Sequence, residues 1–152
     1  CDSHLYDYVT FGPTSAYHVW SGQEQLNTRF NRWVYVYTPL VHYSRSGYVR
    51  GVNVLLKAGA DRDDRGSTAL KVACICKRTD VVKALIDAGS DVNSSNPFGW
   101  TVLMDACERG HTDIVTALID AGADVNAPFH DGWTALMWAC MYYRTNIVNI
   151  VI

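Results

Sequence analysis

The chain has 152 residues, of which 49% are hydrophobic, and a formal net charge of −2 at pH 7. This balance predicts a globular chain with a sizeable core and excludes disorder caused by low hydropathy and high charge. The sequence has no polybasic run and no apolar stretch of about 18 residues, which argues against nucleic-acid binding, anionic membranes and membrane insertion. The start at Cys1 also lacks the basic and apolar regions of a signal peptide.

The first part of the chain, residues 1–32, is rich in aromatic residues but has no counterpart later in the sequence. Leu26 and Phe30 are spaced i, i+4, which predicts a short capping helix at 23–32. Alternating β-forming residues at 33–37 predict a strand directly after it. Residues 1–32 are therefore separated from the rest as an N-terminal segment that is otherwise unassigned.

A period of 33 residues organises the rest of the chain. The pattern Gly-x-Asp-Val-Asn at 89–93 returns at 122–126, and a Thr-x-Leu pattern starts at Thr68, Thr101 and Thr134. A more degenerate copy starts earlier with Thr-Pro-Leu. A period of this length predicts a solenoid, because one unit cannot bury its own apolar face and must stack on its neighbours. The predicted units are 33–62, 63–95, 96–128 and a truncated last unit, 129–152.

Each unit is predicted to form two helices. A threonine hydroxyl can cap the first helix by accepting a hydrogen bond from a backbone N–H of the first turn. The threonines in this position are Thr38, Thr68, Thr101 and Thr134. Glycines can adopt the positive φ that ends a helix. Those predicted to end the first helix are Gly47 and Gly110, and those predicted to end the second are Gly59, Gly89 and Gly122.

Three features depart from a regular array. The stretch from Gly59 to Thr68 spans nine residues instead of twelve, which predicts a shorter first finger. In the last unit Tyr143-Arg144 replaces a Gly-His pair, so this turn must form without glycine. The apolar residues of 147–152 predict a helix that a further repeat or a polar cap would cover, so we expect a longer natural protein.

The unit from Thr101 to Asn126 resembles the ankyrin repeat, whose signature opens with Thr-Pro-Leu-His and closes with Gly-Ala-Asp-Val-Asn. It departs from that signature mainly at Val102 and Met104. The resemblance covers residues 33–152 and implies an all-α dominated repeat solenoid, in which helix-turn-helix units are joined by β-hairpin-like fingers. It also implies that partners bind to the fingers and to the concave side of the first helices.

Three cysteines, Cys74, Cys107 and Cys140, occupy the same place in successive units. A metal or redox ladder is one interpretation, but stacked helices lie about 8–10 Å apart, too far for a disulfide or a shared zinc ion. We therefore prefer the alternative that they are buried as small apolar side chains. Cys1 and Cys76 show no disulfide spacing, which favours a reducing compartment, the cytoplasm or else the nucleus.

No catalytic constellation stands out. His111 and Asp113 could act as a base and its orienting carboxylate, but no nucleophile motif accompanies them. The resemblance instead places His111 at a turn that supports neighbouring loops. Asp61, Asp91 and Asp124 recur in the hairpin pattern and are predicted to bond local backbone amides. The sequence therefore predicts no catalytic residue, no cofactor and no metal site.

Aromatic residues in two successive fingers are the main functional candidates. Large aromatics on exposed fingers either pack on the adjacent finger or contact a partner. The resemblance places several residues of the first helices beside them. The predicted partner-binding residues are Phe98, Trp100, Asp105, Glu108, Arg109, Phe129, Trp133, Trp138, Met141 and Tyr142.

Two asparagines, Asn93 and Asn126, are candidate modification sites. Each follows Asp-Val and lies eight residues after a leucine, a context that resembles ankyrin asparagines hydroxylated by an oxygenase. The alternative is a purely structural role, because asparagine suits a turn.

These features predict a non-catalytic module that binds a protein partner. The alternative is the targeting or scaffold portion of a larger enzyme or channel, whose catalytic or membrane part lies outside these residues. The balance of charge disfavours a third hypothesis, an independent nucleic-acid binder.

Overall fold

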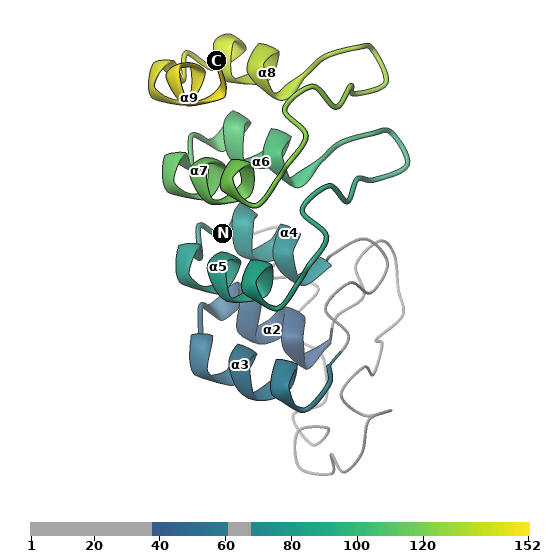
Figure 1. Ribbon diagram of the computed structural model, residues 1–152, viewed down its shortest axis with the longest axis vertical. Coiled ribbons are helices and arrows are strands. Elements are labelled where there is room, and N and C mark those ends of the chain that lie inside the picture. The colour runs from purple at the N-terminus through teal and green to yellow at the C-terminus, as the bar shows by residue number, and fades with distance from the viewer. Residues whose placement is uncertain (1–37, 61–67) are drawn as a thin grey trace, which may run out of the picture.

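The computed structural model describes residues 38–60 and 68–152, and in these ranges the chain folds into eight helices without a strand. The helices form four pairs that stack along the long axis of the molecule (Figure 1). Their bounds are α2 (Pro39–Ser46), α3 (Val49–Lys57), α4 (Thr68–Ile75), α5 (Thr79–Asp87), α6 (Val102–Arg109), α7 (Thr112–Asp120), α8 (Ala135–Met141) and α9 (Thr145–Val151). This arrangement confirms the predicted repeat solenoid.

The helices contact one another in two rows. An inner row consists of α2, α4, α6 and α8 in that order, and an outer row consists of α3, α5, α7 and α9. Leucines at the same place in successive units, Leu70 and Leu103 in the inner row and Leu85 and Leu118 in the outer row, are buried. Each buried leucine stabilises the fold by roughly 1.5–3 kcal/mol relative to an exposed one. Neighbouring units therefore supply one another's core.

Two long loops project from the side of the inner row (Figure 1). We call residues 90–101, between α5 and α6, the first long finger, and residues 123–134, between α7 and α8, the second long finger. The predictions of a helix at 23–32, a strand at 33–37 and a shorter first finger concern residues outside the described ranges. Within those ranges, no helix has the length and apolar character needed to cross a membrane.

The predicted threonine caps are confirmed at two of four positions. Thr38 accepts a hydrogen bond from the N–H of Val41, and Thr101 accepts one from Met104, each at 3.3 Å. The prediction is wrong for Thr134, which has the extended cap conformation but forms no side-chain capping bond. At the remaining position, α4 begins at Thr68 itself, one residue earlier than predicted.

The turn between the two helices of each unit uses a left-handed residue. Gly47 and Gly110 have φ of 81° and 78°, as predicted. The equivalent residues Lys77 and Tyr143 have φ of 54° and 56°, although neither is glycine. This conformation costs a non-glycine residue roughly 1–2 kcal/mol. The sequence indicated the exception at Tyr143 but not the one at Lys77.

After three of these four turns, the next residue reaches back to the preceding unit. Arg78 Nε donates to the carbonyl oxygen of Arg45 at 2.9 Å, and Arg144 donates from Nε and Nη2 to the carbonyl oxygen of Glu108 at 3.2 Å. His111 occupies the equivalent place and forms a hydrogen bond with the backbone of Ile75. This contact agrees with the expected supporting role of His111. Burial affects the pKa of the His111 imidazole more than this hydrogen bond does, and it lowers that pKa below the usual value.

Candidate partner-binding surface

The first long finger is organised by Asn96. Its Oδ1 accepts hydrogen bonds from the backbone N–H groups of Phe98 and Trp100, both at 3.0 Å. A single antiparallel bridge joins Ser95 to Thr101. In the second long finger the N–H of Phe129 donates to the carbonyl oxygen of Trp133 at 2.7 Å. The fingers are therefore hairpin-like turns rather than regular β-hairpins.

Aspartates and one asparagine hold the bases of the fingers. Asp91 accepts from the N–H of Asn93, and Asp124 accepts from the N–H of Asn126, each at 2.9 Å, which confirms their predicted local roles. The Asn93 side chain also joins the two fingers, since its Nδ2 donates to the carbonyl oxygen of Gly122 at 3.2 Å and its Oδ1 accepts from Asp124 N at 2.7 Å. These bonds give Asn93 a structural function, while its hydroxylation and that of Asn126 stay predictions.

Aromatic side chains from both fingers meet on helix α8. We call Trp100, Phe129, Trp133 and Trp138 the aromatic cluster. The ring of Trp100 lies edge-on to Phe129 at 5.4 Å and to Trp138 at 4.9 Å between centroids, and Trp133 lies 5.0 Å from Trp138. Each such pair contributes about 0.5–1.5 kcal/mol beyond simple burial. For Trp100 and Phe129, the structure therefore shows the packing between fingers that was one of the two interpretations.

Beside the aromatic cluster, three large side chains are exposed. Phe98 at the fingertip is 63% exposed, while Met141 and Tyr142 at the end of α8 are 57% and 42% exposed. The ring of Tyr142 is nearly parallel to that of Trp138, at 21° and 6.4 Å between centroids. A hydrogen bond between the Tyr142 hydroxyl and the Glu108 side chain raises the pKa of Tyr142. The Tyr142 bond therefore joins the end of α8 to Glu108 of α6.

A carboxylate lies beneath the aromatic cluster. Asp105 is 6% exposed, and the indole N–H of Trp100 donates to it. Burial raises the pKa of Asp105 above the ordinary value, although the Trp100 bond and the charges of Lys71 and Arg109 act in the opposite direction. Its Oδ2 and the indole nitrogen of Trp138 have no hydrogen-bond partner among the described residues. The sequence predicted Asp105 as a contact residue, but it lies in the interior.

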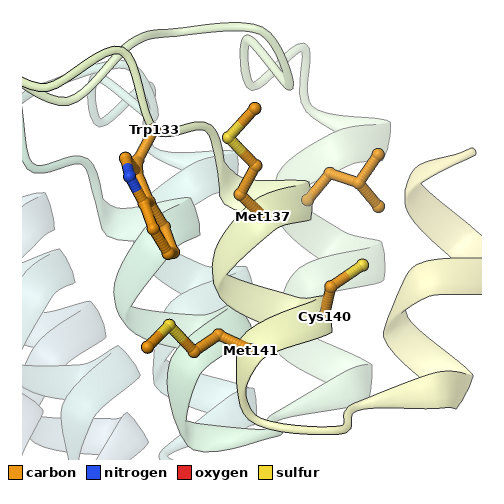
Figure 2. A pocket seen from close by; sticks show the side chains of 5 residues that line it. Trp133, Met137, Cys140 and Met141 are labelled. Carbon is orange, nitrogen blue, oxygen red and sulfur yellow. The ribbon is translucent and has the colours of Figure 1, made fainter.

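An open apolar pocket adjoins the aromatic cluster at the end of the stack. It has a volume of about 490 Å³ and is lined by Trp133, Leu136, Met137, Cys140 and Met141. Figure 2 shows Met137, Cys140 and Met141 projecting from α8, with Trp133 of the second long finger beside that helix. The equivalent residues one unit earlier, Leu103, Met104 and Cys107, are buried, and their helix α6 packs against α8. The sequence did not single out Leu136 and Met137, although the 33-residue spacing connects them to buried positions.

The burial of the three equivalent cysteines also differs between units. Cys74 and Cys107 are buried and free, as predicted, and burial raises the pKa of Cys107 to about 12. The prediction of burial is wrong for Cys140, which is free but exposed because no described unit packs on its face of α8. Cys76 is disulfide-bonded. The cysteines therefore do not support the predicted reducing compartment. Among the described residues, no group of three or more His, Cys, Asp or Glu side chains could hold a metal ion.

Comparison with known proteins identifies the repeat. A family model described as ankyrin repeats in three copies matches residues 21–96 and 88–152. A search of curated proteins finds none that matches the chain.

Proposed function

Because the chain belongs to the ankyrin-repeat family, whose members generally bind proteins, we propose that it is a non-catalytic module that binds one protein partner. The proposed contact surface consists of the two long fingers and the neighbouring ends of α6 and α8. Its residues are the predicted set, namely Phe98, Trp100, Glu108, Arg109, Phe129, Trp133, Trp138, Met141 and Tyr142, with Asp105 supporting them from below.

One observation supports this location more than any other. The aromatic cluster joins both fingers to α8. Three exposed side chains adjoin it at different places: Phe98 through His130, Tyr142 against Trp138, and Met141 in the pocket shared with Trp133. Binding hot spots are typically such clusters, because a rigid aromatic base loses little conformational entropy when a partner covers it. The packed residues therefore hold the surface in shape, and the exposed ones are available for contact.

The test separates binding from folding. We would capture partners from a lysate of the source organism with the wild-type chain and identify the retained protein. Its dissociation constant would then be measured for the wild type, for a Phe98→Ala/Tyr142→Ala variant and for Val54→Ala. Val54 is a matched control because it is also exposed but lies on α3, in the outer row.

We expect the double variant to weaken binding by about 2 kcal/mol or more, with a thermal midpoint close to that of the wild type. The control should bind like the wild type. If all three chains bind the retained protein equally, the fingers and α8 are not the contact surface.

The alternative is a targeting or scaffold portion of a larger enzyme or channel. It requires the same binding surface, so the full-length reading frame, rather than a binding measurement, distinguishes it. The predicted location is the cytoplasm, with the nucleus as the alternative. The disulfide of Cys76 argues against such a reducing compartment, and imaging of the tagged full-length protein would test the location.

A further inference from the structure

The surface formed by the aromatic cluster and α6 combines aromatic rings with the carboxylates of Asp105 and Glu108, which indicates the chemistry of its partner. We propose that it binds an arginine side chain of the partner protein, with the guanidinium group against the rings of Trp138 and Tyr142 and paired with Glu108. This inference rests on the proposed function, because it specifies what the same surface recognises.

Charge is distributed unevenly along the chain. Residues 90–152 carry seven carboxylates and two arginines and contain no lysine, whereas residues 1–89 carry eight carboxylates and eleven lysines and arginines. The formal side-chain charge is therefore −5 in residues 90–152, which form the long fingers and helices α6 to α9, and +3 in the rest. An acidic surface attracts a cationic partner segment and repels an acidic one.

Trp138 and Tyr142 supply a platform for a planar cation. Both side chains project from α8 one turn apart, and their nearly parallel rings lie 6.4 Å apart between centroids. Tyr142 is 42% exposed, so its ring is open to a ligand. Guanidinium groups stack on aromatic faces, where the negative charge of the ring face attracts them. The arrangement suits arginine better than lysine, because only the guanidinium is flat.

Glu108 supplies the opposite charge at the edge of this platform. Its side chain is bonded to the Tyr142 hydroxyl, and its backbone carbonyl oxygen is bonded to Arg144. The residue is therefore held in place from two directions before any ligand binds. Pre-arranged carboxylates bind guanidinium through strong, charge-assisted hydrogen bonds.

Asp105 adds a second, interior carboxylate that solvent screens poorly. It is 6% exposed and bonded to Trp100, and its Oδ2 has no partner among the described residues. A poorly screened negative charge under the aromatic cluster strengthens the attraction of a cation above it. Lys71 and Arg109 offset part of this charge, so the Glu108 carboxylate beside Tyr142, rather than Asp105, carries the argument.

The experiment uses short peptides that differ at one position. The probe is a seven-residue Gly/Ser peptide with blocked ends and a central arginine, and the matched peptides carry citrulline, lysine or leucine there. Binding to the full chain is followed by NMR through the indole N–H signals of Trp100, Trp133 and Trp138. Citrulline has nearly the shape of arginine without its charge, so the comparison isolates the cation.

We expect the arginine peptide to bind at about millimolar concentration, at least about fivefold more tightly than the citrulline peptide, as the size of an exposed cation–π contact suggests. The Trp138 signal should shift most. Equal binding of the citrulline or leucine peptide would overturn the proposal in favour of an apolar contact. Tighter binding of the lysine peptide would overturn the role of the planar guanidinium.

Two variants locate the site. Glu108→Gln removes the charge while keeping an acceptor for Tyr142, and it should weaken arginine binding about threefold or more. Asp113→Asn removes the same charge from the exposed outer helix α7 and should leave binding unchanged. If both variants weaken binding equally, the effect is one of net charge and the assigned site is wrong.

Failure here is distinguishable from failure of the proposed function. If a captured protein loses affinity for the Phe98→Ala/Tyr142→Ala variant but no peptide discriminates arginine from citrulline, the binding module stands and the arginine site does not. If the arginine peptide binds but the variant retains every partner, the proposed surface fails while a cation site remains.

Discussion

The backbone N–H of His130 donates to the carbonyl oxygen of Phe98 at 3.0 Å, which joins the tips of the two long fingers. Gly99, the next residue, lies so close to the second long finger that an added Cβ would be 2.8 Å from the carbonyl oxygen of Pro128. Together with the Asn93 bonds at the finger bases, these contacts make the two fingers one structural element. The close contact between the fingers depends on glycine at position 99, which has no Cβ.

Replacing Gly99 with alanine should therefore separate the fingers. Gly99 and Gly132 both have positive φ, 87° and 79°, but a Cβ at Gly132 would meet nothing within 4 Å. Gly132→Ala should lose only about 1 kcal/mol for its backbone conformation. Gly99→Ala should lose clearly more and expose the His130 amide to hydrogen exchange. Urea unfolding and hydrogen exchange measure both, and equal losses would show that the finger contact contributes nothing.

Replacing Lys77 or Tyr143 with glycine should stabilise the turn in which it lies. Both residues have positive φ, and Tyr143 is 89% exposed, so its side chain contributes little packing. Lys77→Gly and Tyr143→Gly should each stabilise the fold by roughly 0.5–1 kcal/mol, the relief of strain less the added entropy of the unfolded chain.

A matched control for these turns is Gly47→Ala. Gly47 has a φ of 81°, and its added Cβ would lie 2.9 Å from Cδ of Arg78. This variant should therefore be destabilised. Thermal unfolding of the three variants is the measurement, and a lower midpoint for both glycine variants would contradict the strain argument.

Trp100 and Tyr142 should respond differently to truncation. Trp100 is packed between Phe129 and Trp138, so Trp100→Ala should destabilise the fold by about 3 kcal/mol. Tyr142 is 42% exposed, so Tyr142→Ala should leave the thermal midpoint within a few degrees but weaken partner binding. Calorimetry and affinity measurements on the same two variants check this, and the reverse order would mean that the aromatic cluster is not structural.

Asp105 should make stability depend on pH. Its pKa is raised in the folded state, mainly by burial. The folded chain therefore binds a proton more tightly than the unfolded one, and the relative stabilisation present below the unfolded pKa is lost as the pH rises through the folded pKa. Asp105→Asn, which can still accept the Trp100 bond, should unfold at a higher temperature than the wild type at pH 7.

The difference between the two chains should shrink as the pH falls through the folded pKa of Asp105 and below its unfolded value. Thermal unfolding between pH 7 and pH 3 provides the comparison. A lower midpoint for Asp105→Asn at pH 7 would show that the attraction of Lys71 and Arg109 for the carboxylate outweighs its burial.

The thiols of the three equivalent cysteines should react at different rates. Cys140 is exposed, whereas Cys74 and Cys107 are buried, and thiol reagents attack the accessible thiolate. A maleimide pulse followed by peptide mapping should label Cys140 in the folded chain and the other two only after unfolding. Labelling of Cys107 as fast as Cys140 would contradict the packing of α8 on α6.

Sequence by itself determined the repeating helices, because the residues that begin and end a helix act within one helical turn. Thr38 and Thr101 bond amides three residues away, and Gly47 and Gly110 adopt their left-handed conformation inside their own turns. Such signals recur every 33 residues, so they identified the solenoid and most helix ends. The segments 1–37 and 61–67 lie outside this comparison.

Only the tertiary structure decided what each repeated side chain contacts. Trp100 and Trp133 have the same place in their units, yet Trp100 packs against Phe129 and Trp138 of the next unit, while Trp133 lines the open pocket. Cys107 and Cys140 differ in the same way. Burial depends on the side chains of the adjacent unit, some 33 residues away, and no local pattern specifies them. The proposed arginine surface likewise depends on the stacking that packs α6 against α8.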